Sequence, residues 1–133
     1  MNDTAILNQT QSYPMKMSVS NVDADASKGE FTANFSADDY YREEGGFIPP
    51  LVFMELLGQT AEKFYITSDG ECKRYLASIE DFSLNEDIYD NLDRDFSVKV
   101  NLIEKFGKLY RGHVSLVLDN TVYCEGTYVH CNA

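Results

Sequence analysis

The sequence predicts one α+β domain, in which a single long buried helix is wrapped by a curved antiparallel sheet of about five to six strands. Three observations support this prediction. The chain has 133 residues, the size of one ordinary domain. One segment has the apolar pattern of a long helix, and the segments on both sides alternate as strands do. No repeat or linker divides residues 1–133, and polar residues 1–12 are expected to be frayed.

Two strands are predicted before the helix. Residues 15–22 alternate apolar and polar side chains, and residues 31–35 do the same after a turn-rich loop at 23–29. The segment 36–46 is irregular and ends in a glycine pair.

The predicted helix covers residues 51–65 and follows Pro49 and Pro50. Proline suits the first helical turn because its missing N–H has no helical partner there. The first two turns are apolar nearly all round, which indicates a buried helix. Asp69 and Gly70 are expected to end it.

The remainder of the chain is predicted to be β-structure. Its predicted parts, in order, are a strand over 75–82, an acidic connection over 85–95, a strand over 96–102, a turn at Gly107-Lys108, a strand over 109–118, a tight hairpin at Asp119-Asn120 and a strand over 121–131. One sheet curling around the helix is the hotdog arrangement, so we expect a hotdog fold.

Composition excludes several classes. There are 22 acidic and 11 basic side chains, a net charge of −11, which argues against binding to nucleic acid or anionic lipid. No apolar stretch approaches the roughly 18 residues of a membrane span, and the start lacks the pattern of a signal peptide. The three cysteines have no CxxC spacing. We therefore expect a cytoplasmic protein with reduced cysteines and without a metal or cofactor.

Glu55 is the first candidate for chemistry, because its neighbours along the helix are apolar. Such a carboxylate is expected to be partly desolvated, with a raised pKa, as in catalytic acids and bases. Gln59 lies one turn further on the same face and is suited to orient the carboxyl group or bind a thioester carbonyl. The alternative is that Glu55 reaches solvent at a dimer seam and pairs with Lys or Arg.

Residues 46–59 resemble the helix entry of the β-hydroxyacyl-acyl-carrier-protein dehydratases, and the resemblance extends over about residues 14–133. That family has a His-Phe-Pro-Gly loop, a Met-Pro-Gly step and an apolar helix with Glu or Asp followed by Gln four residues later. Pro49 matches the step, Glu55 the acid and Gln59 the trailing Gln, and residues 122–126 resemble the last strand. The resemblance implies a hotdog dimer and substrate contacts from Pro49, Pro50, Phe53 and Phe82.

The histidine that serves as base in that family is missing. An ungapped comparison places Tyr41 at its position, and a gapped one places Asn34 there. Neither side chain is a competent base near pH 7, although Tyr41 remains a candidate site residue. His113 and His130 lie in the C-terminal strands and are expected to have structural or solvent contacts.

Three functions follow. The first is a dehydratase-like subunit that acts on 3-hydroxyacyl thioesters in fatty-acid or polyketide-type biosynthesis and needs a His-bearing partner chain. The second is an acyl thioesterase that uses Glu55, and the third is a non-catalytic acyl-binding or scaffold protein. The expected partners are an acyl thioester of acyl carrier protein or CoA and a second hotdog chain, in a homodimer or heterodimer. Carrier docking would use Lys73-Arg74 or the group Lys105, Lys108 and Arg111, for which ordinary surface charge is the alternative.

Overall fold

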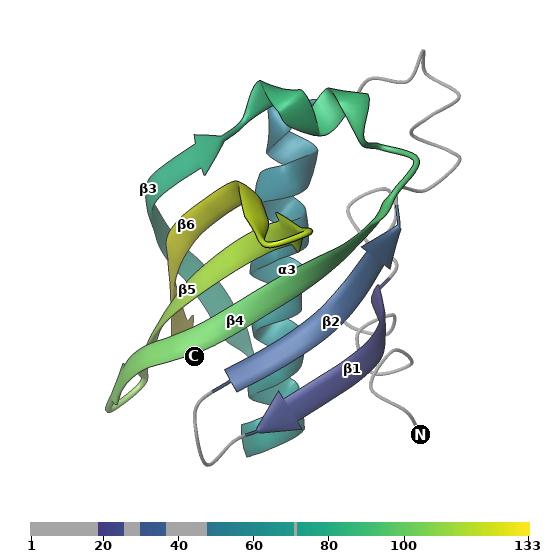
Figure 1. The fold of residues 1–133 in the computed structure, drawn as a ribbon. Helices are drawn as coiled ribbons and strands as arrows, with labels where there is room; N and C mark the ends of the chain where they lie inside the picture. Colours follow the sequence, from purple (N-terminus) through teal and green to yellow (C-terminus); the bar gives the residue numbers. More distant parts are fainter. Residues whose placement is uncertain (1–18, 26–29, 37–47, 71) are drawn as a thin grey trace.

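The computed structural model describes residues 19–25, 30–36, 48–70 and 72–133 (Figure 1). Its six strands form one antiparallel sheet in the order β1-β2-β4-β5-β6-β3. The elements in chain order are β1 (Val19–Asp25), β2 (Glu30–Ser36), α3 (Pro50–Asp69), β3 (Arg74–Leu84), the 3₁₀ helix η1 (Glu86–Asp90), β4 (Asp95–Phe106), β5 (Leu109–Leu118) and β6 (Thr121–Asn132).

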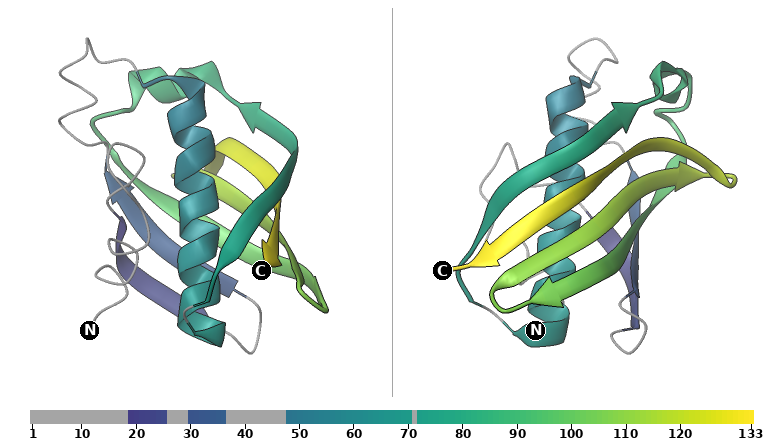
Figure 2. Two further views of the ribbon diagram at one scale, coloured as in Figure 1. Left: turned by 180° about the vertical axis from the view of Figure 1, so that it is seen from behind. Right: turned by 90° about the vertical axis from the view of Figure 1, so that its left-hand side faces the viewer.

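The curved sheet wraps around α3, which confirms the predicted fold class (Figures 1 and 2). The helix runs through residue 69, and Gly70 ends it with a φ of 87°, a conformation that suits glycine. Asp119 and Asn120 both have positive φ, as the predicted tight hairpin requires. Among the described residues, no helix is long and apolar enough to cross a membrane.

The acidic connection contains a structured element that the sequence pattern did not predict. Residues 86–90 form η1, which the Asn85 side chain caps by accepting a hydrogen bond from the Asp87 N–H. The Tyr89 hydroxyl donates to the Ile48 carbonyl at 2.7 Å, and its ring lies edge-on to Phe53. The connection therefore packs against the start of α3.

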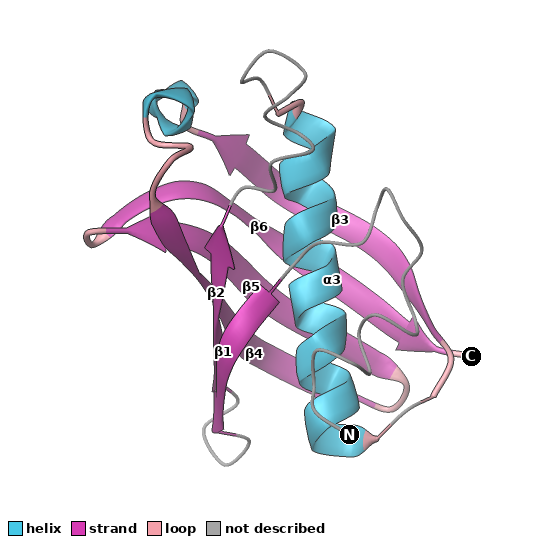
Figure 3. Ribbon diagram, turned by 90° about the vertical axis from the view of Figure 1, so that its right-hand side faces the viewer, coloured by secondary structure: helices cyan, strands magenta, loops and turns pink. Residues whose placement is uncertain are grey.

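The core lies between α3 and the concave face of the sheet (Figure 3). Tyr65 of the helix packs on Tyr110 of β5 with ring centroids 4.5 Å apart, and Phe64 packs on Phe31 of β2. The prediction that the start of the helix is buried all round is wrong, because Leu51 is exposed. The described strands cover one side of α3, so the first turn retains an outer face.

Gly112 in β5 allows a close approach of the Tyr65 side chain of α3 to the sheet. A Cβ atom at this position would lie 2.8 Å from the Tyr65 hydroxyl oxygen. That hydroxyl is buried and has no hydrogen-bond partner among the described residues. The space beside Gly112 is therefore filled by an oxygen atom that contributes no hydrogen bond to the fold.

We predict that Gly112→Ala lowers the free energy of unfolding by about 1–3 kcal/mol, because the added methyl group overpacks the space beside Tyr65. Tyr65→Phe removes the oxygen and should cost little, since that oxygen has no partner. The double variant should regain most of the loss in urea unfolding. A double variant as unstable as Gly112→Ala alone would contradict this account of the contact.

Candidate active site

A cavity of about 400 Å³ lies between α3, the first residues of β3 and the end of β6. The helix contributes four residues from one face, and the segment just before β3 and the two strands contribute the rest. The lining residues are Glu55, Gly58, Gln59, Glu62, Cys72, Lys73, Arg74, Leu76 and His130.

The structure brings the two predicted helix residues into this one cavity. Glu55 is half-buried and Gln59 is buried, one turn apart on α3. Beneath them the Tyr128 hydroxyl donates to the Met54 carbonyl at 2.8 Å, and the Tyr128 ring lies against Gly58. Burial, with the nearby Glu55 carboxylate contributing, raises the pKa of Tyr128, so it remains a neutral phenol. Tyr128 thus fixes the turn of helix that carries Glu55.

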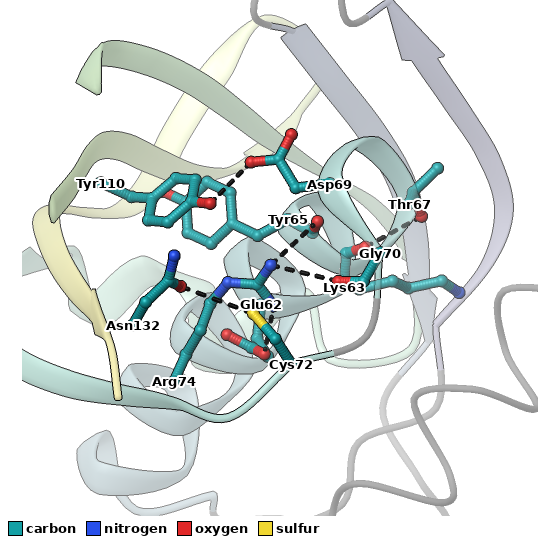
Figure 4. A network of polar contacts seen from close by, with 10 residues as sticks. All are labelled: Glu62, Lys63, Tyr65, Thr67, Asp69, Gly70, Cys72, Arg74, Tyr110 and Asn132. Carbon is teal, nitrogen blue, oxygen red and sulfur yellow. Dashed lines mark hydrogen bonds and ion pairs between the residues drawn. The ribbon is translucent and has the colours of Figure 1, made fainter. Parts of the chain in front are cut away.

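A buried ion pair forms the other end of the cavity. Arg74 Nη1 lies 3.1 Å from Glu62 Oε1, and the exposed fractions of the two side chains are 0% and 13% (Figure 4). Burial raises the pKa of Glu62 above its usual value, and Arg74 offsets part of that shift. Arg74 thus offsets part of the cost of burying the Glu62 carboxylate.

The same guanidinium group also caps the end of α3. Arg74 Nη2 donates to the Tyr65 carbonyl at 3.4 Å and to the Gly70 carbonyl at 3.2 Å. The last turn of the helix carries no basic side chain of its own. A cation from β3 therefore satisfies the carbonyls and the negative end of the helix dipole.

Tyrosines connect this ion pair to a second one. The Arg74 guanidinium lies over the rings of Tyr65 and Tyr110, 5.9 and 5.3 Å from their centroids. The Tyr110 hydroxyl donates to Asp69 at 2.6 Å, and Lys105 donates to the same carboxylate oxygen at 2.9 Å. Both hydrogen bonds lower the pKa of Asp69, and the one from Lys105 has the larger effect. The network joins the end of α3 to β3, β4 and β5.

His130 lies in the cavity wall, which the sequence did not predict. It is 4% exposed, and its ring packs edge-on to Tyr65. Burial, and then the charge of Arg74, lower its pKa to about 4. His130 is therefore a neutral imidazole and a weak base near pH 7.

Of the other predicted site residues, those that the structure describes do not line this cavity. Pro49 and Pro50 are exposed at the start of α3, as expected for prolines in the first turn. Phe53 is fully buried in the core, and Phe82 is half-buried beside Gly126. Tyr41 lies outside the described residues, as does most of the loop that would contain it.

Two predicted surface features also differ. Arg74 was a candidate for carrier docking or for ordinary surface charge, but its side chain is buried and pairs with Glu62. Lys105 is exposed and Arg111 is half-buried, and both are bound to carboxylates, Lys105 to Asp69 and Arg111 to Glu80. Of the three free cysteines, Cys124 is buried and Cys72 is exposed and lines the cavity.

Glu62 was not predicted as a site residue, although its spacing along the helix could have identified it. It lies seven residues after Glu55, a spacing of two helical turns, so the two carboxylates share the helix face that includes Gln59. No local pattern signals Arg74 or His130, because their approach depends on the pairing of β3 with β6. Across the described part of the chain, no cluster of three His, Cys, Asp or Glu side chains is suited to hold a metal ion.

We predict that Arg74→Met costs about 3–5 kcal/mol of unfolding free energy at pH 7, because it leaves the Glu62 carboxylate buried and unpaired. The Glu62→Leu/Arg74→Met double variant should regain most of this loss, since no charge remains buried. Urea unfolding of the wild type and the two variants measures both effects.

The loss in Arg74→Met should also depend on pH. Without Arg74, the folded-state pKa of Glu62 rises further above its unfolded value, so protonation favours the folded state. The deficit relative to wild type should therefore be largest at pH 7 and shrink toward pH 4. A deficit that is constant over this range would refute the assignment of the loss to Glu62.

No protein-family model and no curated protein matches the sequence. Solved structures do match the fold. The candidate thioesterase YhdA of Lactococcus lactis has a TM-score of 0.74 at 13% identity, with 92% of this chain and 98% of that chain covered. Zebrafish thioesterase superfamily member 2 has a TM-score of 0.71 at 12% identity, with 97% and 94% covered. A variant of a Pseudomonas aeruginosa thioesterase also has a TM-score of 0.71, at 13% identity, with 100% and 95% covered. The chain thus has the hotdog fold and resembles structures named as thioesterases.

Proposed function

We propose that this protein hydrolyses acyl thioesters, with Glu55 as the catalytic carboxylate. The observation that supports this most directly is the position of Glu55, half-buried in a cavity of about 400 Å³ beside Gln59. Such a cavity has the size of small-molecule binding sites. Names of the structural neighbours agree with this reaction class.

In the proposed reaction, Glu55 accepts a proton from water as the water oxygen bonds to the thioester carbon. Gln59 is the candidate hydrogen-bond donor to the carbonyl oxygen, which becomes an oxyanion in this step. The carbon–sulfur bond then breaks, and the proton on Glu55 passes to the departing thiolate. The products are a carboxylic acid and a free thiol.

A dehydratase is less well supported than a thioesterase. Dehydration of a 3-hydroxyacyl thioester needs a base for the α-proton, and in the described residues the cavity contains one histidine, His130. Its pKa of about 4 makes that imidazole a poor base near pH 7. The comparisons name thioesterases and do not support the dehydratase interpretation.

We predict that Glu55→Gln lowers kcat by about 100-fold or more, because the amide cannot accept the proton from water. The measurement is thiol release from saturated acyl-CoA and acyl-carrier-protein thioesters. Glu104→Gln is the matched control, because Glu104 is 62% exposed and outside the cavity, and it should retain full activity. Undiminished hydrolysis by Glu55→Gln would rule out this role. Enoyl product from a 3-hydroxyacyl thioester would instead support the dehydratase.

We further propose that two copies associate through β3. This strand lies at an edge of the sheet and exposes Tyr75 and Leu76, which are 52% and 43% accessible. An exposed apolar edge strand favours pairing with another chain. The cavity is lined by the first residues of this strand, so a partner would lie beside the site.

We predict that Ala77→Lys, which places a charge on the exposed β3 edge, shifts the protein from twice the chain mass to the 15.1 kDa of one chain. Light scattering after size-exclusion chromatography measures this mass. Ile103→Lys places the same charge on an exposed position of β4 and should leave the mass unchanged. A wild-type protein of single-chain mass would refute the proposed dimer.

A further inference from the structure

The polar end of the cavity has no part in the proposed hydrolysis. It is formed by Glu62, Arg74 and His130, and Glu62 lies seven residues beyond Glu55 on the same helix face. At 1.5 Å of rise per residue, this spacing places the polar end about 10 Å along the helix axis from the catalytic carboxylate. If a thioester binds with its reacting carbon at Glu55, only a part of the molecule remote from that carbon reaches the polar end.

Each of these three side chains has a buried atom without a hydrogen-bond partner. The atoms are Glu62 Oε2, Arg74 Nε and His130 Nδ1. Buried polar atoms of folded proteins nearly always have partners, so three exceptions at the same end of one cavity are informative. They indicate that a polar group of a ligand completes the hydrogen bonding of this wall.

These side chains can turn toward a ligand at low cost. Both residues line the cavity, and because the terminal torsions of glutamate and histidine have broad minima, these two side chains are able to reorient toward a group bound there. The rotation leaves the backbone in place. In particular, it preserves the hydrogen bonds from Arg74 to the end of α3.

The charge of the polar end selects the kind of group. Glu62 and Arg74 neutralise each other, and His130 is uncharged near pH 7. The remaining cation of the lining, Lys73, has its ammonium group 5.8 Å from the centroid of the exposed Tyr75 ring. A further ion beside Glu62, Arg74 and His130 would have no counter-charge left among these three side chains, which is costly. Glu62 supplies an acceptor and Arg74 a donor, which a hydroxyl or an amide matches with its own donor and acceptor.

We propose that Glu62, Arg74 and His130 form a subsite that binds a neutral hydroxyl or amide group of the thioester, about 10 Å from its reacting carbon. This inference rests on the proposed thioesterase function. Two parts of a substrate place such a group at that distance, which corresponds to about eight bonds. One is a hydroxyl at the far end of an eight-carbon acyl chain, and the other is the second amide of the pantetheine that carries the acyl group.

Two substrate pairs separate these sources. The first compares kcat/KM for 8-hydroxyoctanoyl-CoA and octanoyl-CoA, which differ in the acyl hydroxyl. The second compares octanoyl-pantetheine with octanoyl-N-acetylcysteamine, which lacks the second amide. We expect a preference of about tenfold or more for the polar member of one pair, the effect of a hydrogen bond to a charged partner. The pair that shows it identifies the source.

Three variants test whether the subsite causes the preference. His130→Phe keeps an aromatic ring against Tyr65, and Glu62→Leu/Arg74→Met removes the ion pair without leaving an unpaired charge. Both should reduce the preference to about twofold or less. His113→Phe is the matched control, because His113 is bound to Glu125 outside the cavity, and it should retain the preference.

The outcomes distinguish this inference from the proposed function. If thioesters are hydrolysed but neither pair shows a preference, or if the preference persists in both subsite variants, the subsite is refuted. If no thioester is hydrolysed, the proposed function fails, and calorimetric binding of the corresponding thioether analogues tests the subsite by itself. Equal affinities of the analogues within each pair would then refute it.

Discussion

The guanidinium group of Arg74 holds the helix and the edge of the sheet in one arrangement. It binds Glu62 in the middle of α3, the carbonyls of Tyr65 and Gly70 at its end, and the faces of two tyrosine rings. Because Arg74 is the first residue of β3, these contacts fix where the edge strand begins relative to α3. The cavity lies between these two elements, so its shape depends on this one side chain.

Tyrosine hydroxyls position the rest of the helix. Tyr128 binds the Met54 carbonyl near the start of α3, and Tyr110 binds Asp69 at its end. Tyr89 of η1 binds the Ile48 carbonyl just before the helix. Each of these side chains buries an aromatic body and still satisfies its hydroxyl group. The helix is thus anchored at both ends by polar contacts from elements distant in sequence.

Alternation and turn residues were sufficient to predict the fold, because both are local properties of the chain. The pattern over 109–118, the hairpin at Asp119-Asn120 and the break at Gly70 all appear in the structure. The 3₁₀ helix at 86–90 was missed, since an acidic segment that packs by one tyrosine and one isoleucine has no periodic signal.

The candidate site was predictable only in the part contributed by one helix. Glu55 and Gln59 were found because helical spacing relates them. Arg74 and His130 join them only through the pairing of β3 with β6, which no spacing in the sequence specifies. Arg74 was therefore mistaken for a surface residue, and His130 for a residue unrelated to the site.

The chain places two glutamates on one helix face and gives them different surroundings. Glu62 faces a buried arginine, so its charge is neutralised and it holds structure. Glu55 lies two turns earlier and half-exposed, and among the described residues it has no ion pair. A carboxylate without a cation beside it keeps its lone pairs available to a water molecule. The same residue type thus forms a neutralised ion pair at one end of the cavity and, among the described residues, a carboxylate without an ion pair at the other.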